Sequence, residues 1–130
     1  MTTASIQSGN TADDQALIIK IRLSDGDMGS KEDEDRMFKL DDELRDAITK
    51  AQAGDYDGHE FGAGNFTVYI YGASAERLFE VAWPILALYE FRAGSHAIKH
   101  YGKPGSKKDI VPLVKKAEAQ DTRIRNEHND

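Results

Sequence analysis

The sequence predicts an α+β domain in which two helices pack on one face of a four-stranded antiparallel sheet. Three observations support this prediction. A run with the two-residue alternation of a strand precedes a longer run with helical spacing. A central β-hairpin follows, with strands at 54–61 and 66–72 joined by the glycine-rich link 62–65. A second helical run and another strand-like run come after the hairpin, so the expected order is β-α-β-β-α-β.

Residues 16–23 form the first expected strand. Their odd-numbered positions are apolar and form the face that we expect in the core: Leu17, Ile19, Ile21 and Leu23. Ile18, Lys20 and Arg22 form the opposite face. Residues 1–15 are polar and lack periodicity, so we expect a disordered leader there.

The first expected helix begins after Ser30, whose side chain can cap it, and Asp33 places an acid in the first turn. Gly54 is expected to supply the left-handed conformation that ends this helix. Apolar residues recur at spacings of three and four and form a stripe for the core: Met37, Leu40, Leu44, Ile48 and Ala51.

The second expected helix runs from a cap at Ser74 to about Tyr89, and Gly94 is expected to terminate it. Pro84 lacks an amide donor and clashes with the preceding turn, so we expect a kink near 80–84. The residues available to the core are Leu78, Phe79, Ala82, Ile85, Leu86 and Tyr89.

Residues 95–101 form the fourth expected strand. We expect Ile98 to face inward, toward the helices. This choice would place Lys99 and Tyr101 on the outer face and would turn His96 and His100 toward the helix side.

A short run at 110–114 offers an additional edge strand, interrupted by Pro112. Including it, we expect one domain over 16–114, followed by a polar tail at 115–130, and a chain of 130 residues suits one domain. No apolar run approaches the roughly 20 residues that a membrane span needs, and the N-terminus lacks the features of a signal peptide. We therefore expect a cytoplasmic protein that does not bind membranes.

This arrangement is the ferredoxin-like fold, whose right-handed crossovers place the first and third strands at the centre and leave one sheet face open. If Phe66, Val68 and Ile70 face the helices, the open face carries cationic and aromatic side chains: Lys20, Arg22, Tyr69 and Tyr71. This set resembles in position the stacking platform of RNA-recognition domains. Tyrosine and arginine are also enriched at protein interfaces, and a homodimer through this face is a further alternative.

Acidic residues dominate the body of the chain. The net charge is -6 overall and +2 over residues 103–130, so residues 1–102 carry -8. Ten acids and four bases within 24–46 would attract a basic protein surface and repel nucleic acid, although a solvated helix face has the same composition. Since the chain has no cysteine, disulfides, thiolate nucleophiles and cysteine zinc sites are excluded.

The first hairpin strand contains four side chains of the types that bind divalent ions: Asp55, Asp57, His59 and Glu60. In a regular strand the first three would share one face and the fourth would lie on the other, so at most three could converge. In the structural interpretation, Asp57 and Gly58 form a bulge while Tyr56 and Phe61 pack. No nucleophile elbow or phosphate loop is present, so we expect neither an enzyme nor a cofactor.

Two motifs give the chain a family resemblance. Gly54 to Glu60 has the pattern Gly-x-Tyr-Asp-Gly-x-Glu, and Tyr69 to Gly72 has the pattern Tyr-x-Tyr-Gly. Together they are similar to motifs of a group of small bacterial proteins of ferredoxin-like fold. The first also resembles the Glu-Tyr-Asp-Gly-Trp segment of the ribonuclease E inhibitors called regulator of ribonuclease activity B. His59 replaces the tryptophan and a mixed tail replaces their acidic tail, so the resemblance implies a non-catalytic acidic protein with a basic partner, without specifying a ribonuclease.

These observations predict a non-catalytic protein-binding module that regulates a basic partner such as a nuclease or toxin, as immunity-type inhibitors do. The alternatives are an RNA-binding domain that uses the open face and a small metal-dependent enzyme at Asp57, His59 and Glu60. The candidate binding residues are Lys20, Arg22, Tyr56, Asp57, His59, Glu60, Tyr69 and Tyr71.

Overall fold

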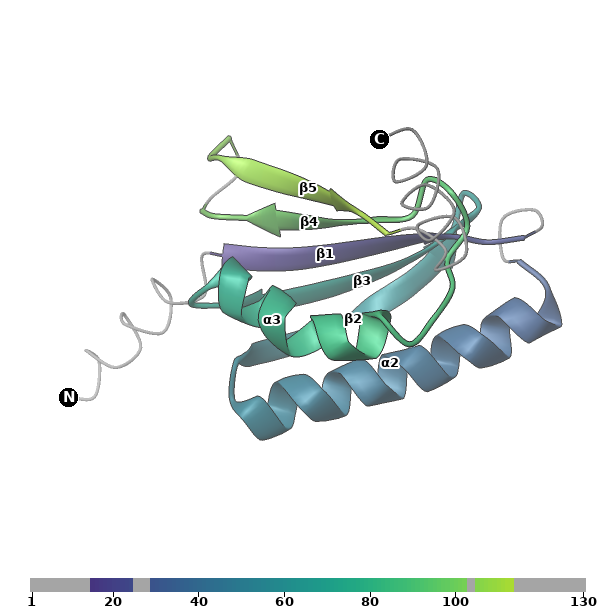
Figure 1. Cartoon of the computed structure of the whole chain (residues 1–130), viewed down its shortest axis with the longest axis horizontal. Coiled ribbons are helices and arrows are strands. Elements are labelled where there is room, and N and C mark those ends of the chain that lie inside the picture. The colour runs from purple at the N-terminus through teal and green to yellow at the C-terminus, as the bar shows by residue number, and fades with distance from the viewer. Residues whose placement is uncertain (1–14, 25–28, 103–104, 114–130) are drawn as a thin grey trace, which may run out of the picture.

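The computed structural model of this chain describes residues 15–24, 29–102 and 105–113 and has an α+β architecture (Figure 1). The elements, in chain order, are β1 (Gln15–Arg22), α2 (Lys31–Ala51), β2 (Gly54–Gly62), β3 (Asn65–Gly72), α3 (Ala75–Leu86), β4 (His96–His100) and β5 (Lys108–Pro112). The expected leader and tail lie outside the described residues, except that Gln15 begins β1.

The strands form one antiparallel sheet in the order β2-β3-β1-β4-β5. The expected count of four strands is corrected to five, because β5 pairs with β4 along its whole length. The central strand is therefore β1 alone, flanked by β3 and β4, rather than the first and third strands together. Pro112 is the last residue of β5, an edge strand, where the missing amide donor is tolerated.

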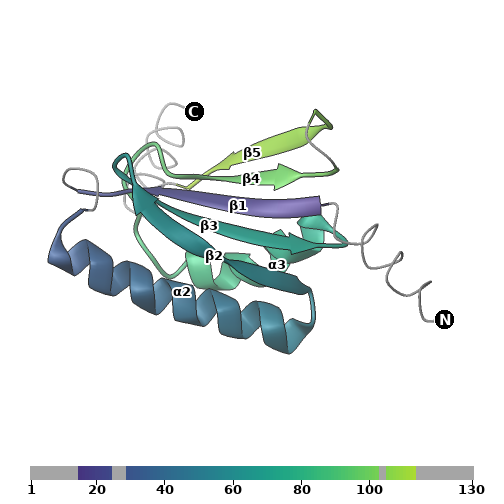
Figure 2. The ribbon, with the colours of Figure 1, turned by 180° about the vertical axis from the view of Figure 1, so that it is seen from behind.

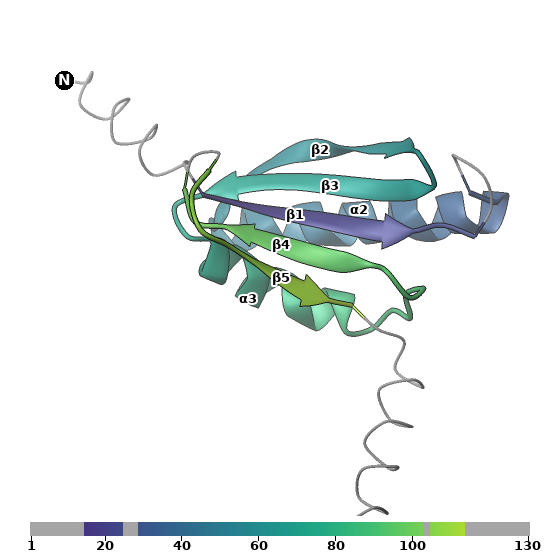
Figure 3. The same cartoon turned by 90° about the horizontal axis from the view of Figure 1, so that it is seen from above.

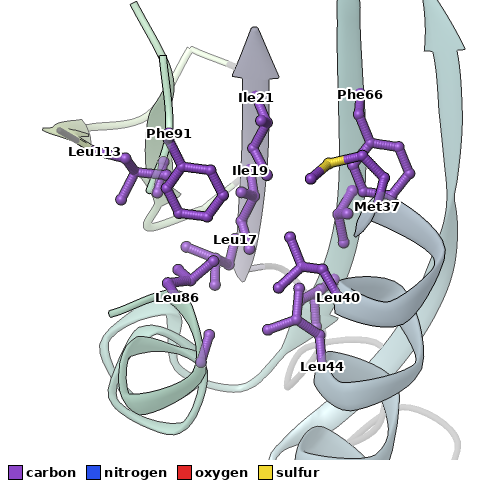
Figure 4. Packing of buried hydrophobic residues seen from close by; sticks show 14 of the residues in the cluster. Leu17, Ile19, Ile21, Met37, Leu40, Leu44, Phe66, Leu86, Phe91 and Leu113 are labelled. Carbon is purple, nitrogen blue, oxygen red and sulfur yellow. The ribbon is translucent and has the colours of Figure 1, made fainter. Parts of the chain in front are cut away.

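Both helices cover the same face of the sheet, which we call the covered face (Figure 2). α2 packs on β2, and α3 packs on β1, β3 and β4. The predicted alternation of β1 is confirmed, since its odd-numbered residues are buried while Arg22 on the other side is exposed. Side chains from both layers meet in the core (Figure 4), including Leu17, Ile19, Ile21, Met37, Leu40, Leu44, Phe66 and Leu86.

The central hairpin is confirmed and turns within two residues. Ala63 and Gly64 both adopt positive φ, 55° and 79°. Two successive residues with positive φ characterise the type I′ turn, whose twist matches that of the flanking strands. Each strand therefore extends one residue further into the link than expected, to Gly62 and Asn65.

The ends of α2 are set by Ser30 and Gln52. The predicted cap at Ser30 is confirmed, and the Asp33 side chain bonds back to the Ser30 amide, so that the two residues form a reciprocal capping box. The left-handed residue at the other end is Gln52, with φ 52°, and not Gly54. Gly54 lies in β2, where a Cβ would stand 2.1 Å from the carbonyl oxygen of Tyr71. Glycine is required there by the close approach of the two strands and not by helix termination.

α3 is capped by Ser74 as expected, continues across Pro84 and ends at Leu86. The predicted end at Tyr89 and Gly94 was therefore too late. The amides of Leu88 and Tyr89 bond to carbonyls three residues back instead of four, as in tight turns. The predicted core positions at 78, 82 and 86 are buried.

Candidate functional site

The face of the sheet opposite the helices is the open face, seen directly in Figure 3. Both helices lie behind the sheet in this view, and none of the described elements lies in front of it. Cross-strand pairing places one outward residue from each strand in a single row across the sheet. This central row is Gly58, Tyr69, Ile18, Ile98 and Ile110. Four of its five members carry apolar or aromatic side chains, and Ile110 is 58% exposed.

Two further rows flank the central row and carry the charges. The first flanking row is Asp55, Tyr71, Ala16, His100 and Lys108, and the second is Glu60, Thr67, Lys20, His96 and Pro112. The acids of both rows belong to β2 at one edge, whereas the lysines and histidines belong to β1, β4 and β5. The open face therefore has an acidic side and a basic side.

Five of the predicted binding residues gather on this face: Lys20, Arg22, Glu60, Tyr69 and Tyr71. The Tyr69 hydroxyl donates a hydrogen bond to Glu60 Oε2 at 3.3 Å. Burial raises the pKa of Tyr69, and the nearby Glu60 carboxylate raises it further. This phenol therefore remains a neutral hydrogen-bond donor at physiological pH.

The predicted orientation of β4 is wrong. Ala97 pairs with the buried Ile19, so the inward positions of β4 are odd-numbered, and Ile98 points to the open face. Lys99 accordingly lies on the covered side, where its ammonium group pairs with Glu76 of α3 at 3.1 Å. The two histidines of β4 and Ile98 join the open face, while Tyr101 bonds to α3.

The remaining predicted residues of β2 are separated by a β-bulge. Tyr56 pairs with Ile70 and Gly58 pairs with Tyr69, so Asp57 has no partner of its own on β3. The structural interpretation of this segment is therefore confirmed. The bulge places Tyr56 and His59 on the covered side, contrary to the regular alternation expected from the sequence.

Tyr56 and His59 both contact Asp41 of α2, whose side chain is only 4% exposed. The Tyr56 hydroxyl donates to Asp41 Oδ1, and His59 Nδ1 lies 3.0 Å from the same oxygen. Arg45 Nη2 pairs with Oδ2 at 2.5 Å. Burial raises the pKa of Tyr56, and the hydrogen bond to Asp41 raises it further. We call Asp41, Arg45, Tyr56 and His59 the Asp41 cluster. Its contacts connect β2 to α2 and use both oxygens of the Asp41 carboxylate.

The geometry does not bring together the metal ligands considered from the sequence. His59 lies on the covered side, Glu60 on the open side, and Asp57 is exposed at the bulge. Over the described ranges, no three His, Asp or Glu side chains are grouped so as to hold a metal ion. Neither of the two helices within those ranges is long and apolar enough to cross a membrane.

Most of the acidic segment predicted from composition lies in α2, where its acids other than Asp41 are exposed or partly exposed, while Asp25 and Asp27 lie outside the described residues. Part of its charge is paired along the helix, as between Lys31 and Asp35 at 3.2 Å and between Lys50 and Asp46 at 3.0 Å. Phe38, 47% exposed, projects from the same helix and packs edge-on against Phe61. This acidic surface lies in the layer opposite the open face.

Sequence reasoning missed several residues of the open face and also Asp41. Ile98 was the expected inward residue of β4, yet the smaller Ala97 fills the inward position. The only sequence signal for Asp41 was its spacing of four residues from Arg45 and one residue from Leu40, on the edge of the apolar stripe.

Comparison with protein-family models, with curated proteins and with solved structures finds no match to this chain. The family resemblance of the two hairpin motifs therefore stays a prediction. Function has to be argued from the geometry and chemistry of the site itself.

Proposed function

We propose that this protein is a non-catalytic protein-binding module of ferredoxin-like fold and that the open face of its sheet is the interface. The fold assignment is supported by the order β2-β3-β1-β4 of the first four strands and by the two helices on one face. β5 is then an extension of that fold at one edge. The absence of cysteine suits a reducing compartment, and the cytoplasm is the proposed location.

The central row carries this proposal. It crosses all five strands with apolar or aromatic side chains at four positions, and no described residue packs on it. Charged and polar residues flank it on both sides. An apolar centre with a polar rim, containing tyrosine and few charges, is the composition of a protein interface.

The proposed partner is a basic protein, such as a nuclease or toxin that this chain would regulate or inhibit. Its support is the net charge of -6 and the acidic outer surface of α2. Because α2 lies in the layer opposite the open face, its acids would act by long-range attraction during encounter. Such attraction raises association rates more than it raises affinity.

RNA binding by the same face is the second candidate function. The observation that favours it is the group of cationic and histidine side chains on the same face as Tyr69 and Tyr71: Lys20, Arg22, His96, His100 and Lys108. Against it stand Asp55 and Glu60 on the same face and the acidic charge of the chain. Both would repel phosphate.

The testing experiment is affinity capture from a lysate of the source cell with the tagged chain. The variant Tyr69→Ala/Tyr71→Ala removes two aromatic side chains of the open face, and Trp83→Ala removes an exposed aromatic from α3 as a matched control. We expect a basic protein to be captured by the wild type and the control but not by the double variant. Capture that the double variant retains would overturn the proposal, and nuclease-sensitive capture of RNA would establish the second candidate.

A further inference from the structure

We infer that the open face binds a second copy of this chain, sheet against sheet, about a twofold axis that runs parallel to the strands along β1. This inference rests on the proposed function, since it requires the open face to be a protein interface. Three features of the face support it: the central position of β1, the distribution of charge, and the shape of the central row.

The strand order allows every strand of one copy to lie over a strand of the second copy. β1 is the middle strand, with two strands on each side. A twofold axis along it places β1 over β1 of the second copy, β3 over β4, and β2 over β5. Two twisted sheets that pack face to face keep their strands within about 30° of each other, so rows of one copy lie over the same rows of the other.

One pair of opposite charges on the open face is complementary under this operation. In the first flanking row Asp55 stands at the β2 end and Lys108 at the β5 end. The twofold axis places Asp55 over Lys108 of the second copy, and by symmetry the same pair forms twice. Within one chain the two residues are four strands apart, about 19 Å at the usual strand spacing, so they do not pair with each other.

The alternative twofold axis, in the same plane but perpendicular to the strands, is disfavoured by the same charges. That axis would place β2 over β2 and exchange the two flanking rows. Asp55 would then lie over Glu60 of the second copy, and Glu60 over Asp55, so acids would face acids twice along the β2 edge of the interface. Like charges placed in contact oppose association and select against that packing.

The central row is complementary in shape as well. It begins at Gly58, which has no side chain, and ends at Ile110, which is the most exposed residue of the row. The strand-parallel axis places Ile110 over Gly58 of the second copy, and Tyr69 over Ile98. A projecting side chain meets a position without one, as close packing between two sheets requires.

The two cations of β1, Lys20 and Arg22, are not favoured by the arrangement. Both lie on β1 beside the axis, so each faces its counterpart in the second copy. Like charges in these positions repel each other, which weakens the dimer. Replacing the charge of Lys20 with an apolar side chain of similar length should therefore strengthen the association, the opposite of what RNA binding predicts.

The area of the open face limits the expected affinity of the dimer. Five strands about 4.8 Å apart and three outward rows about 6.6 Å apart give a footprint of about 500 Å² per copy. The two copies together bury about 1,000 Å², the lower end of the range for specific interfaces. The dimer should therefore form in the micromolar range and depend on protein concentration.

The experiment measures the oligomeric state of the full chain by sedimentation velocity over about 1 μM to about 1 mM. We expect reversible dimerisation of the wild type. Asp55→Lys and Lys108→Asp should each weaken it about tenfold or more, and the double exchange should restore it. Asp46→Lys, the same charge change on the outer surface of α2, should leave the dimer unchanged, and Lys20→Met should strengthen it. Circular dichroism confirms that each variant is folded.

Restoration by the double exchange requires the two residues to meet across the interface. A chain that stays monomeric at about 1 mM, or a dimer that neither charge reversal weakens, would overturn the inference. A monomer that still captures another protein through Tyr69 and Tyr71 would overturn only the inference and leave the proposed function standing. If neither dimerisation nor protein capture changed in any open-face variant, both the inference and the proposed function would be overturned. A Lys20→Met variant that stays monomeric and loses nuclease-sensitive binding would assign the face to RNA.

Discussion

The two faces of the sheet are built from the same five strands but differ in what their side chains contact. On the covered face, Leu17, Ile19 and Ile21 are fully enclosed by the helices, and the buried carboxylate of Asp41 has three donors. On the open face, Ile18 and Ile98 lie in a row on which no described residue packs. The comparison indicates that the covered face stabilises the fold, whereas the open face is the proposed recognition surface. Substitutions at neighbouring residues of one strand should therefore change either stability or binding.

The largest expected effect comes from adjacent residues of β1. Ile19→Ala should lower the free energy of unfolding by about 3 kcal/mol, since it creates a cavity in a fully packed core. Ile18→Ala, one residue away on the open face, should cost about 1 kcal/mol or less because its side chain is already partly solvated. Urea denaturation at low protein concentration measures both. Equal losses of unfolding free energy in the two variants would contradict the proposed difference between the covered and open faces.

Next in size is the Asp41 cluster. Asp41→Ala should cost about 2–3 kcal/mol, because it leaves the Tyr56 hydroxyl and His59 without their acceptor and removes one of the two carboxylates that pair with Arg45. The pKa of Tyr56 should fall toward its ordinary value, although burial would keep it raised, and absorbance titration of the phenol measures that shift. Asp42→Ala is the control, since Asp42 pairs with the same arginine at an exposed position. A loss as large for Asp42 would show that the arginine pair, and not burial, provides the stabilisation.

A smaller, pH-dependent effect is expected at the start of α2. Burial acts to raise the pKa of Asp33, but hydrogen bonds from Ser24 and Ser30 outweigh it, and the pKa lies below its ordinary value of 3.8. The stabilisation that the ionised Asp33 carboxylate gives the fold is therefore fully present above its ordinary pKa of 3.8. It is lost as pH falls through the lowered pKa.

Asp33→Ala should thus cost about 1 kcal/mol at neutral pH, as loss of a helix cap does, and the difference from wild type should vanish in strong acid. Ser30→Ala removes the other half of the capping box without removing a carboxylate, so its cost should persist in acid. Thermal unfolding monitored across the acid range separates the two. A pH-independent loss for Asp33→Ala would contradict the pKa assignment.

The smallest effect concerns Lys99, whose ammonium lies between Glu76 and the ring of Phe79. Lys99→Met keeps the methylene packing on the covered side and should shift the denaturation midpoint little, because the Glu76 carboxylate that pairs with Lys99 is 56% exposed and solvent screens the pair. The same substitution at Lys20 on the open face should change association instead. A large loss of stability in Lys99→Met would show that this ion pair is a structural contact rather than a marginal one.

The sequence allowed the covered face to be predicted better than the open face. Alternation in β1 and the stripe of α2 identify their inward residues, because burial of large apolar side chains leaves a strong periodic signal. β4 has no such signal: Ala97 and Ile98 are both apolar, and the choice is made by pairing with β1, a long-range contact. The row that forms the candidate interface depends on that pairing and on the register of β5. The close approach at Gly54 also follows from pairing with β3, which local propensity does not specify, whereas the bulge at Asp57 was one of the interpretations that the sequence offered.

The bulge in β2 has a consequence for tolerance to insertion and deletion. Because Asp57 is the extra residue, a chain lacking it would have Tyr56, Gly58 and His59 in regular alternation, and every side chain would keep its present face. Deleting Glu60 instead would move the following residues of the strand to opposite faces unless the ladder were rebuilt. Asp57 is thus the residue of β2 whose deletion would leave every other side chain of the strand on its present face of the sheet.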